Sequence, residues 1–261
     1  MDDLLIIIII VGHARATQKG WLSPFETACG ATLLLILAFM VGISLAVEAS
    51  NTSGSLDSIG LFITISSVFN AVAYTGGPYP LGYIGLGNLS IGYSGLGDIF
   101  VLAYFGFVAT LGVPYLFTKI IPIPPQTQTQ LLEMAFWMAV PIGCLATGII
   151  VVNNLRDRHT DIHTRKMTLA VRFGGSFARW EYTILIIVSY LILVPFSIWY
   201  NSSYYFLPMI SIPIAMTQLK AVSLKGSKDG SDLNPHVGGT AKLQLIYCIL
   251  LSISIQLSST S

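Results

Sequence analysis

The chain has 261 residues, of which 54% are hydrophobic and only 10% carry a charge, and its mean hydropathy is +0.74. Because a soluble domain has about 25% charged residues, this composition excludes a disordered chain, an ordinary soluble enzyme and a nucleic-acid-binding protein with a basic face. It indicates a polytopic membrane protein, and the net charge of +1 becomes informative only when the charges are assigned to segments.

Seven apolar stretches are candidates for membrane-spanning helices, because a helix is the only open-chain structure that satisfies its own backbone hydrogen bonds in lipid. They lie at about 27–47, 59–74, 99–117, 134–152, 182–200, 204–218 and 241–257, and the second and sixth are short for a bilayer. We therefore expect an all-α fold, a polytopic membrane helix bundle of about seven transmembrane helices. Residues 1–26 would form an N-terminal segment on the cytoplasmic side, 27–258 the bundle and 259–261 a C-terminal tail.

The positively charged residues concentrate on one side of such a seven-span chain. The connections at 51–58 and 201–203 hold no Lys or Arg, and the connection at 118–133 holds only Lys119. The other twelve cations all fall on the opposite side: Arg15, Lys19, Arg156, Arg158, Arg165, Lys166, Arg172, Arg179, Lys220, Lys225, Lys228 and Lys242. The positive-inside rule makes that side cytoplasmic, or stromal or matrix in an organelle.

The Gly-rich connection at 75–98 contains an internal repeat. The pattern GYxGLG[ND] occurs at 82–88, ending in Asn88, and again at 92–98, ending in Asp98. Its Gly and Pro residues disfavour a helix and allow the backbone to approach a ligand closely. The segment is either a tight connection or a cap over a polar pocket, and in the second case Tyr74, Tyr83 and Asp98 are its candidate site residues, with Asp98 at a helix entry.

The connection at 153–181 carries the strongest functional signal. If the preceding helix continues into it, Asn153, Asp157 and Asp161 lie at i, i+4 and i+8 and share one helix face. Two carboxylates one turn apart beside an amide form an oxygen-rich site that suits Mg²⁺ together with a substrate phosphate. Nearby cations such as Arg156 and Lys166 would bind the remaining phosphate charge. The alternative is a solvated loop with ordinary ion pairs, and the spacing leaves both open.

Zinc is disfavoured at the same segment. His159 and His163 also lie at i and i+4, but a zinc site needs at least a third protein ligand. His13 and His236 are distant in the sequence, and no Cys is near.

Three segments resemble a known family in their residues and in their order. NNLRDRHTDIHTRKMTLAVRFG (153–174) resembles the second aspartate-rich motif of the UbiA superfamily of intramembrane prenyltransferases, although Arg165 stands where that family usually has Gly. AYTGGPYPLGYIGLG (73–87) and LNPHVGGTAKLQLIYCILL (233–251) resemble two further segments of its 1,4-dihydroxy-2-naphthoate branch, which serves menaquinone and phylloquinone synthesis.

The resemblance implies a Mg²⁺-dependent transfer from a prenyl diphosphate to an aromatic acceptor at a membrane. The acceptor would be 1,4-dihydroxy-2-naphthoate, with 4-hydroxybenzoate or homogentisate as alternatives. Asp157 and Asp161 would be the catalytic, metal-binding carboxylates, with Asn153 as a further metal ligand. The diphosphate would be bound by Asn154, Arg156, Lys166 and Arg172. The membrane would be a bacterial plasma membrane or a plastid or other organelle membrane.

The chain departs from the family pattern at its N-terminal side. Family members have nine helices and a first aspartate-rich motif, similar to NDxxDxxxD, which this sequence does not contain. Residues 13–24 resemble the stretch just after that motif, so we expect residues 1–26 to be a remnant and the chain to be N-terminally truncated. An inactive homologue that binds lipid or a partner protein is therefore an alternative. A transporter is disfavoured because the spans hold few charges.

Overall fold

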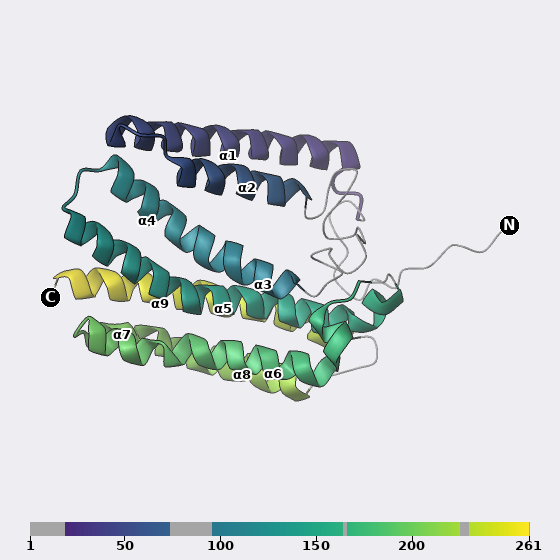
Figure 1. The fold of residues 1–261 in the computed structure, drawn as a ribbon. Coiled ribbons are helices and arrows are strands. Elements are labelled where there is room, and N and C mark those ends of the chain that lie inside the picture. Colours follow the sequence, from purple (N-terminus) through teal and green to yellow (C-terminus); the bar gives the residue numbers. More distant parts are fainter. Residues whose placement is uncertain (1–18, 74–95, 164–165, 225–229, 261) are drawn as a thin grey trace.

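The computed structural model describes residues 19–73, 96–163, 166–224 and 230–260, and every regular element in these ranges is a helix (Figure 1). The first half of the chain forms α1 (Pro24–Ser53), α2 (Ser58–Ala73), α3 (Gly97–Val101), the π-helix η2 (Leu102–Val108), α4 (Ala109–Ile120) and α5 (Pro125–His163). The second half forms α6 (Leu169–Leu191), α7 (Leu193–Trp199), the 3₁₀ helix η3 (Ser203–Ser211), α8 (Ile212–Leu224), the 3₁₀ turn η4 (Ser231–Leu233) and α9 (Asn234–Thr260).

The long helices lie side by side and cross the bundle in alternating directions (Figure 1). The starts of α1, α3, α6 and α9 and the ends of α2, α5 and α8 gather at one end, which we call the motif end. The α1–α2 and α4–α5 connections lie at the opposite end, the far end. Lys119, in the last turn of α4, is therefore separated from the cations at the ends of α5 and α8, as the charge pattern predicts.

Six helical segments are long and apolar enough to cross a membrane, and α2 is a shorter apolar helix. Each of the seven predicted stretches coincides with helix, so the prediction of an all-α polytopic bundle is confirmed. The connection predicted at 153–181 and the one left between the sixth and seventh predicted stretches are both wrong in extent, because α5 continues to His163 and α9 already begins at Asn234. Hydropathy marks the part of a helix that lies in lipid, whereas backbone hydrogen bonding continues into its polar ends.

Local sequence signals fix both ends of α1. The Ser23 hydroxyl accepts from the backbone N of Glu26 at 3.1 Å, and the Glu26 carboxylate accepts from the backbone N of Ser23 at 2.7 Å. This reciprocal capping box satisfies N–H groups that have no partner inside the helix. Gly54 follows the last turn with φ +69°, a left-handed conformation in which a glycine ends a helix without steric cost.

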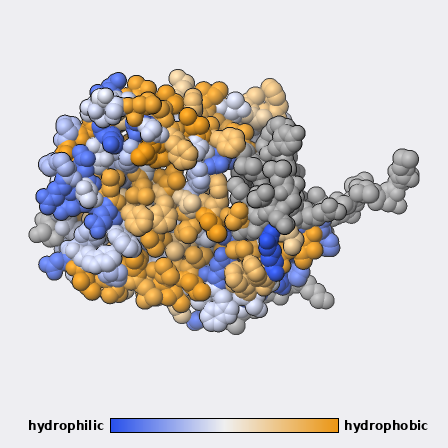
Figure 2. Space-filling model, in the orientation of Figure 1, coloured by the Kyte–Doolittle hydropathy of each residue, from blue (hydrophilic) through white to orange (hydrophobic). Residues whose placement is uncertain are grey.

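The core of the bundle surrounds α5, whose Leu145 is fully buried. Tyr182, Phe196 and Tyr247 pack with it from α6, α7 and α9, and all three are fully buried. By contrast, α1 has only Ala46 and Ala49 buried and exposes large apolar side chains along its length. Figure 2 shows apolar side chains across the middle of the molecule and polar ones gathered toward its ends, as a bilayer requires.

The η2 and α5 helices cross at a pair of glycines. A Cβ atom on Gly106 would lie 2.7 Å from the Cα of Gly143, and one on Gly143 would lie 2.9 Å from the side chain of Leu102. Small residues at such crossings let two membrane helices approach closely, and packing then replaces the hydrophobic effect as the driving force. This contact holds the α3–η2–α4 rod against the helix that carries the polar motif.

We expect Gly106→Val to destabilise the bundle, because it forces η2 away from α5. Overpacking of this kind costs about 1–3 kcal/mol. Thermal unfolding in detergent, followed by intrinsic fluorescence, measures the loss. Gly30→Val on α1 is the matched control, since no atom lies within 4 Å of a Cβ at that position. Equal melting temperatures for the two variants would contradict the close crossing.

Candidate active site

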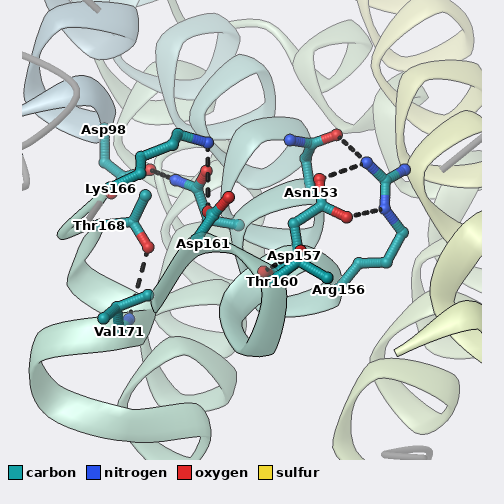
Figure 3. Close-up of polar contacts among 10 residues, drawn as sticks. Asp98, Asn153, Arg156, Asp157, Thr160, Asp161, Lys166, Thr168 and Val171 are labelled. Carbon is teal, nitrogen blue, oxygen red and sulfur yellow. Dashed lines mark hydrogen bonds and ion pairs between the residues drawn. The ribbon is translucent and has the colours of Figure 1, made fainter. Parts of the chain in front are cut away.

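The polar motif forms the last turns of α5. Because this helix continues to His163, Asn153, Asp157 and Asp161 occupy three successive turns of one helix face, as predicted (Figure 3). The turns lie beyond the most apolar part of α5, at the motif end of the bundle. The carboxylates are therefore placed where the apolar interior meets the polar connections.

The guanidinium group of Arg156 joins several of these side chains. Its Nε donates to Oδ1 of Asp157 at 2.7 Å and its Nη2 to Oδ2 of the same carboxylate at 2.6 Å. The same Nη2 donates to Oδ1 of Asn153 at 2.7 Å, and Nη1 donates to Oδ1 of Asn234 at 3.3 Å. A two-point pair between Arg and carboxylate fixes the orientation of both groups. It holds Asp157 and Asn153 beside each other on the α5 face (Figure 3).

Asp161 forms a second ion pair with Lys166. The Lys166 ammonium lies 3.2 Å from Oδ2 of Asp161, and the backbone N of Lys166 donates to the Asp161 carbonyl at 2.9 Å. The chain therefore turns back directly after α5. The next helix begins at once, because the buried hydroxyl of Thr168 accepts from the backbone N of Val171 and caps the start of α6.

The adjacent residues Asn153 and Asn154 contact different partners. Asn154 is buried and donates from Nδ2 to Oδ1 of Asp98 at 3.2 Å, whereas Asn153 faces Arg156. Consecutive residues on a helix point about 100° apart, so one Asn reaches α3 and the other reaches the carboxylate face. Asp98 lies in the first turn of α3, as predicted from its place at the end of the Gly-rich repeat. The predicted site residue Asp98 is thus brought to the motif.

Further cations surround the start of α6. Arg172 is exposed and donates from Nε to the carbonyl of Met167 at 3.1 Å. Arg158 lies over Gly175, where a Cβ would come within 2.2 Å of its Nη1. Arg179 donates to the carbonyl of Val222 in the last turn of α8, where a cation also suits the helix dipole. The motif end therefore carries both the carboxylates and a group of cations suited to an anionic ligand.

Some predicted residues fall outside the described ranges. Tyr74, Tyr83 and Asn88 belong to residues 74–95, so the predicted cap over the pocket stays a prediction. In the part of the chain that the structure describes, no group of three or more His, Cys, Asp or Glu side chains forms a metal site. His159 and His163 gain no third ligand in those ranges.

An open, largely apolar pocket of about 710 Å³, which we call the apolar cavity, lies between α2, η2, α4 and the first turns of α5. Its lining includes Ile59, Ile63, Phe107, Leu111, Leu132 and Phe136. Tyr115 also borders it and donates to Oδ1 of Asp57 at 2.6 Å. One helix, α5, therefore lines this cavity with its first turns and carries the polar motif on its last turns.

Residues 12–234 match the sequence profile of the UbiA prenyltransferase family. The chain belongs to this family. It is 30% identical over 250 residues to 1,4-dihydroxy-2-naphthoate octaprenyltransferase of Escherichia coli, covering 95% of this chain and 73% of that protein. The enzyme of the same name from Haemophilus influenzae is 28% identical over 254 residues, which cover 94% and 72% of the two chains.

A vertebrate member is also similar. UbiA prenyltransferase domain-containing protein 1 of Gallus gallus is 28% identical over 209 residues, covering 79% of this chain and 57% of that protein. No solved structure matches the chain. Family membership, predicted from the motif at 153–174 and the two accompanying segments, is confirmed, and the protein is an integral membrane prenyltransferase of the UbiA family.

Two residues of this UbiA site have no role in the sequence prediction. Asn234 contacts Arg156 from α9, and Gly230 packs so closely on α5 that a Cβ would lie 2.0 Å from the Arg156 carbonyl oxygen. Asn234 belongs to the segment 233–251, which resembles the family. That resemblance indicated that the segment matters but did not indicate that Asn234 contacts Arg156. Gly230 also has φ +71°, a conformation that favours glycine.

We expect Gly230→Ala to displace the chain before α9 from α5 and to lower the stability of the protein. A left-handed conformation alone costs about 1–2 kcal/mol for a residue with a side chain. Gly54→Ala is the matched control, because Gly54 has φ +69° but no atom within 4 Å of a Cβ. The melting temperature of Gly230→Ala should fall clearly below that of Gly54→Ala. Identical values would show that the contact with Arg156 is absent in solution.

Proposed function

We propose that this UbiA-family protein transfers a prenyl group from a prenyl diphosphate to 1,4-dihydroxy-2-naphthoate, in menaquinone or phylloquinone synthesis. The C–O bond between the prenyl group and diphosphate breaks, a carbon–carbon bond to the ring forms, and the acceptor loses its carboxyl group as CO₂. The observation that carries the proposal is the carboxylate face of α5, with Asp157 and Asp161 among cations at the end of an apolar bundle. The names of the bacterial relatives support the choice of acceptor.

The residues present fit Mg²⁺ as a cofactor. Asp157 and Asp161 offer carboxylate oxygens and Asn153 an amide oxygen from one helix face, which are the hard ligands this ion prefers. Mg²⁺ usually takes one or two carboxylates and completes its shell with water and substrate phosphate. When bound, Mg²⁺ would neutralise the charge that develops on the departing diphosphate.

We assign a separate role to each polar residue at this site. Asp157 and Asp161 would hold the cation, and Asn153 would orient it from the preceding turn. Lys166 and Arg172 lie at the entry to α6, and we assign to them the binding of diphosphate oxygens. Asn154 holds Asp98 and so keeps α3 against the site. The aromatic side chains of the bundle shield the allylic cation by cation–π contact.

The contacts of Arg156 limit what it contributes directly to diphosphate. A guanidinium group has five N–H donors, and the four hydrogen bonds to Asn153, Asp157 and Asn234 use four of them. Counting only contacts with the described residues, one N–H is left for a diphosphate oxygen. We therefore assign direct diphosphate contacts chiefly to Lys166 and Arg172.

We propose that the distal part of the prenyl tail lies in the apolar cavity between α2, α4 and α5. Its lining of Ile, Leu and Phe side chains suits a hydrocarbon. The tail would extend along α5, from the carboxylate face at the motif end to the cavity formed by the first turns of the same helix.

We expect Leu111→Trp to shorten the prenyl chains that the protein accepts, because the indole would fill part of the cavity. Turnover of octaprenyl diphosphate should fall about tenfold, roughly the effect of 1.4 kcal/mol, while turnover of geranyl diphosphate stays the same. Competition between the two donors in one reaction measures the change. Val113→Trp is the control, since Val113 is 73% exposed on α4 and does not line the cavity. A uniform loss with both donors would contradict the tail position.

The orientation follows from charge. The concentration of cations at the motif end supports the proposal that this end, and the site with it, lies on the cytoplasmic or stromal face, by the positive-inside rule. The host is a bacterial plasma membrane or a plastid or other organelle membrane. A cysteine-labelling reagent that cannot cross membranes is applied to intact cells or organelles. It should label Ser55→Cys at the far end and leave Asp232→Cys at the motif end unlabelled.

The decisive experiment measures prenyl transfer by the full chain in lipid nanodiscs, with Mg²⁺ and labelled octaprenyl diphosphate. Dihydroxynaphthoate should give a prenylated product with release of CO₂, and 4-hydroxybenzoate and homogentisate should give little. Asp157→Asn and Asp161→Asn should each lower the rate on the order of 10²–10³-fold, because they remove negative charge that holds the cation. Asp232→Asn is the control, since Asp232 is exposed at the same end of the bundle.

Each alternative has its own outcome in this assay. Unchanged turnover in the Asp157 and Asp161 variants would refute the site. Preference for 4-hydroxybenzoate or homogentisate would assign a different acceptor. Binding of the labelled donor without product would identify a homologue that binds lipid without catalysis.

A further inference from the structure

We infer that Asn234, at the start of α9, is a positioning residue that sets the orientation of the Asp157 carboxylate through Arg156. The inference rests on the proposed function, in which Asp157 holds a divalent cation. Asn234 lies 77 residues after Asp157 in the chain and outside the aspartate-rich segment 153–174. It is joined to the site by the hydrogen bond that Arg156 Nη1 donates to its side-chain oxygen at 3.3 Å.

The planar guanidinium group of Arg156 transmits this contact. One edge of the group, Nε and Nη2, faces the two oxygens of Asp157 at 2.7 and 2.6 Å. Its Nη1 faces Asn234. Because these nitrogens belong to one rigid plane, a fixed acceptor at Nη1 also fixes the plane of the carboxylate. Each Asp157 oxygen uses one lone pair toward Arg156 and keeps another for a cation.

Without an acceptor on α9, Arg156 and Asp157 would depend on one helix for their orientation. They are neighbours in sequence, and an Arg side chain has many rotamers that lose entropy when held in place. Both side chains are largely buried, with 11% of Arg156 and 19% of Asp157 exposed. A partner from a second helix restricts the guanidinium group to the one plane that satisfies Asp157, Asn153 and Asn234 together.

The turn that precedes α9 holds Asn234 in place. The turn before α9 is seated on α5, because Gly230 lies against the Arg156 carbonyl with no space for a Cβ. The backbone N of Leu233 donates to the Gly230 carbonyl at 2.9 Å, and the Leu233 side chain is buried. The backbone and the side chain of Arg156 are thus both contacted by the same short segment, 230–234. These contacts fix the position of the Asn234 side-chain oxygen relative to Arg156.

The chemistry of Asn234 suits this role. Its amide oxygen accepts from a cation without adding a negative charge that would compete with Asp157 for Arg156. Removal of a residue that hydrogen-bonds to a metal ligand and orients it typically changes metal affinity by about 10–100-fold. Asn234 should therefore affect cation affinity although it does not itself bind the cation.

The test is Mn²⁺ binding by the full chain in detergent, measured by electron paramagnetic resonance titration without substrate. Asn234→Leu and the smaller Asn234→Ala should each weaken Mn²⁺ binding about tenfold. Asn234→Asp should bind Mn²⁺ less tightly than the wild type but more tightly than Asn234→Leu, because it keeps the acceptor for Arg156 and adds a charge that competes with Asp157. In turnover assays the first two variants should recover their kcat at excess Mg²⁺, which a general loss of folding would not allow.

Thr240→Val is the matched structural control on α9. The Thr240 hydroxyl is buried and lies 3.0 Å from the Tyr182 hydroxyl, away from Arg156. The variant should lower the melting temperature and leave the Mn²⁺ affinity unchanged. An equal loss of affinity in Thr240→Val and Asn234→Leu would overturn the inference, because it would show that α9 packing in general supports the site.

The outcomes separate the inference from the proposed function. If Asp157→Ala abolishes Mn²⁺ binding but Asn234→Leu and Asn234→Ala bind like the wild type, Asn234 has no positioning role and the metal site stands. If the wild type binds no Mn²⁺, or if Asp157→Ala and Asp161→Ala bind it normally, the proposed metal site is wrong and the inference fails with it.

Discussion

The ion pair between Arg156 and Asp157 is the interaction on which the organisation of the motif end depends. It brings two charges into a largely buried position, where each would be costly without the other. Arg156 also satisfies Asn153 and Asn234, so one guanidinium group links the carboxylate face of α5 to the start of α9. The pair therefore has an architectural role as well as a chemical one: it connects the helix that bears the motif to the last helix of the bundle.

Two further carboxylates near the motif also have polar partners. Asp161 is paired with Lys166, and Asp98, which is almost fully buried, accepts from the amide of Asn154. The partners of Asp157, Asp161 and Asp98 all lie within residues 154–166. A prenyl diphosphate brings more negative charge, and the nearby Arg172 and the proposed divalent cation would balance it.

The position of α5 explains how a polar site and an apolar bundle coexist in one small protein. Its middle part packs against η2, α6 and α9, its first turns line the apolar cavity, and its last turns carry the carboxylates. The α1 helix is the opposite case, because it exposes most of its apolar side chains and contributes only Ala46 and Ala49 to the interior. Little of α1 is buried within the protein, whereas other helices surround α5, although the two segments have similar hydropathy.

The sequence by itself determined the membrane-spanning stretches, the segregation of cations and the shared face of Asn153, Asp157 and Asp161, because hydropathy and helical periodicity act over short distances along the chain. It did not determine which helix is central, since lipid and protein interior are both apolar. Only the tertiary structure decided that Asn154 turns to Asp98 and that Asn234 reaches Arg156. These contacts join residues 56 and 78 positions apart, and their partners are chosen by how helices pack rather than by any local pattern.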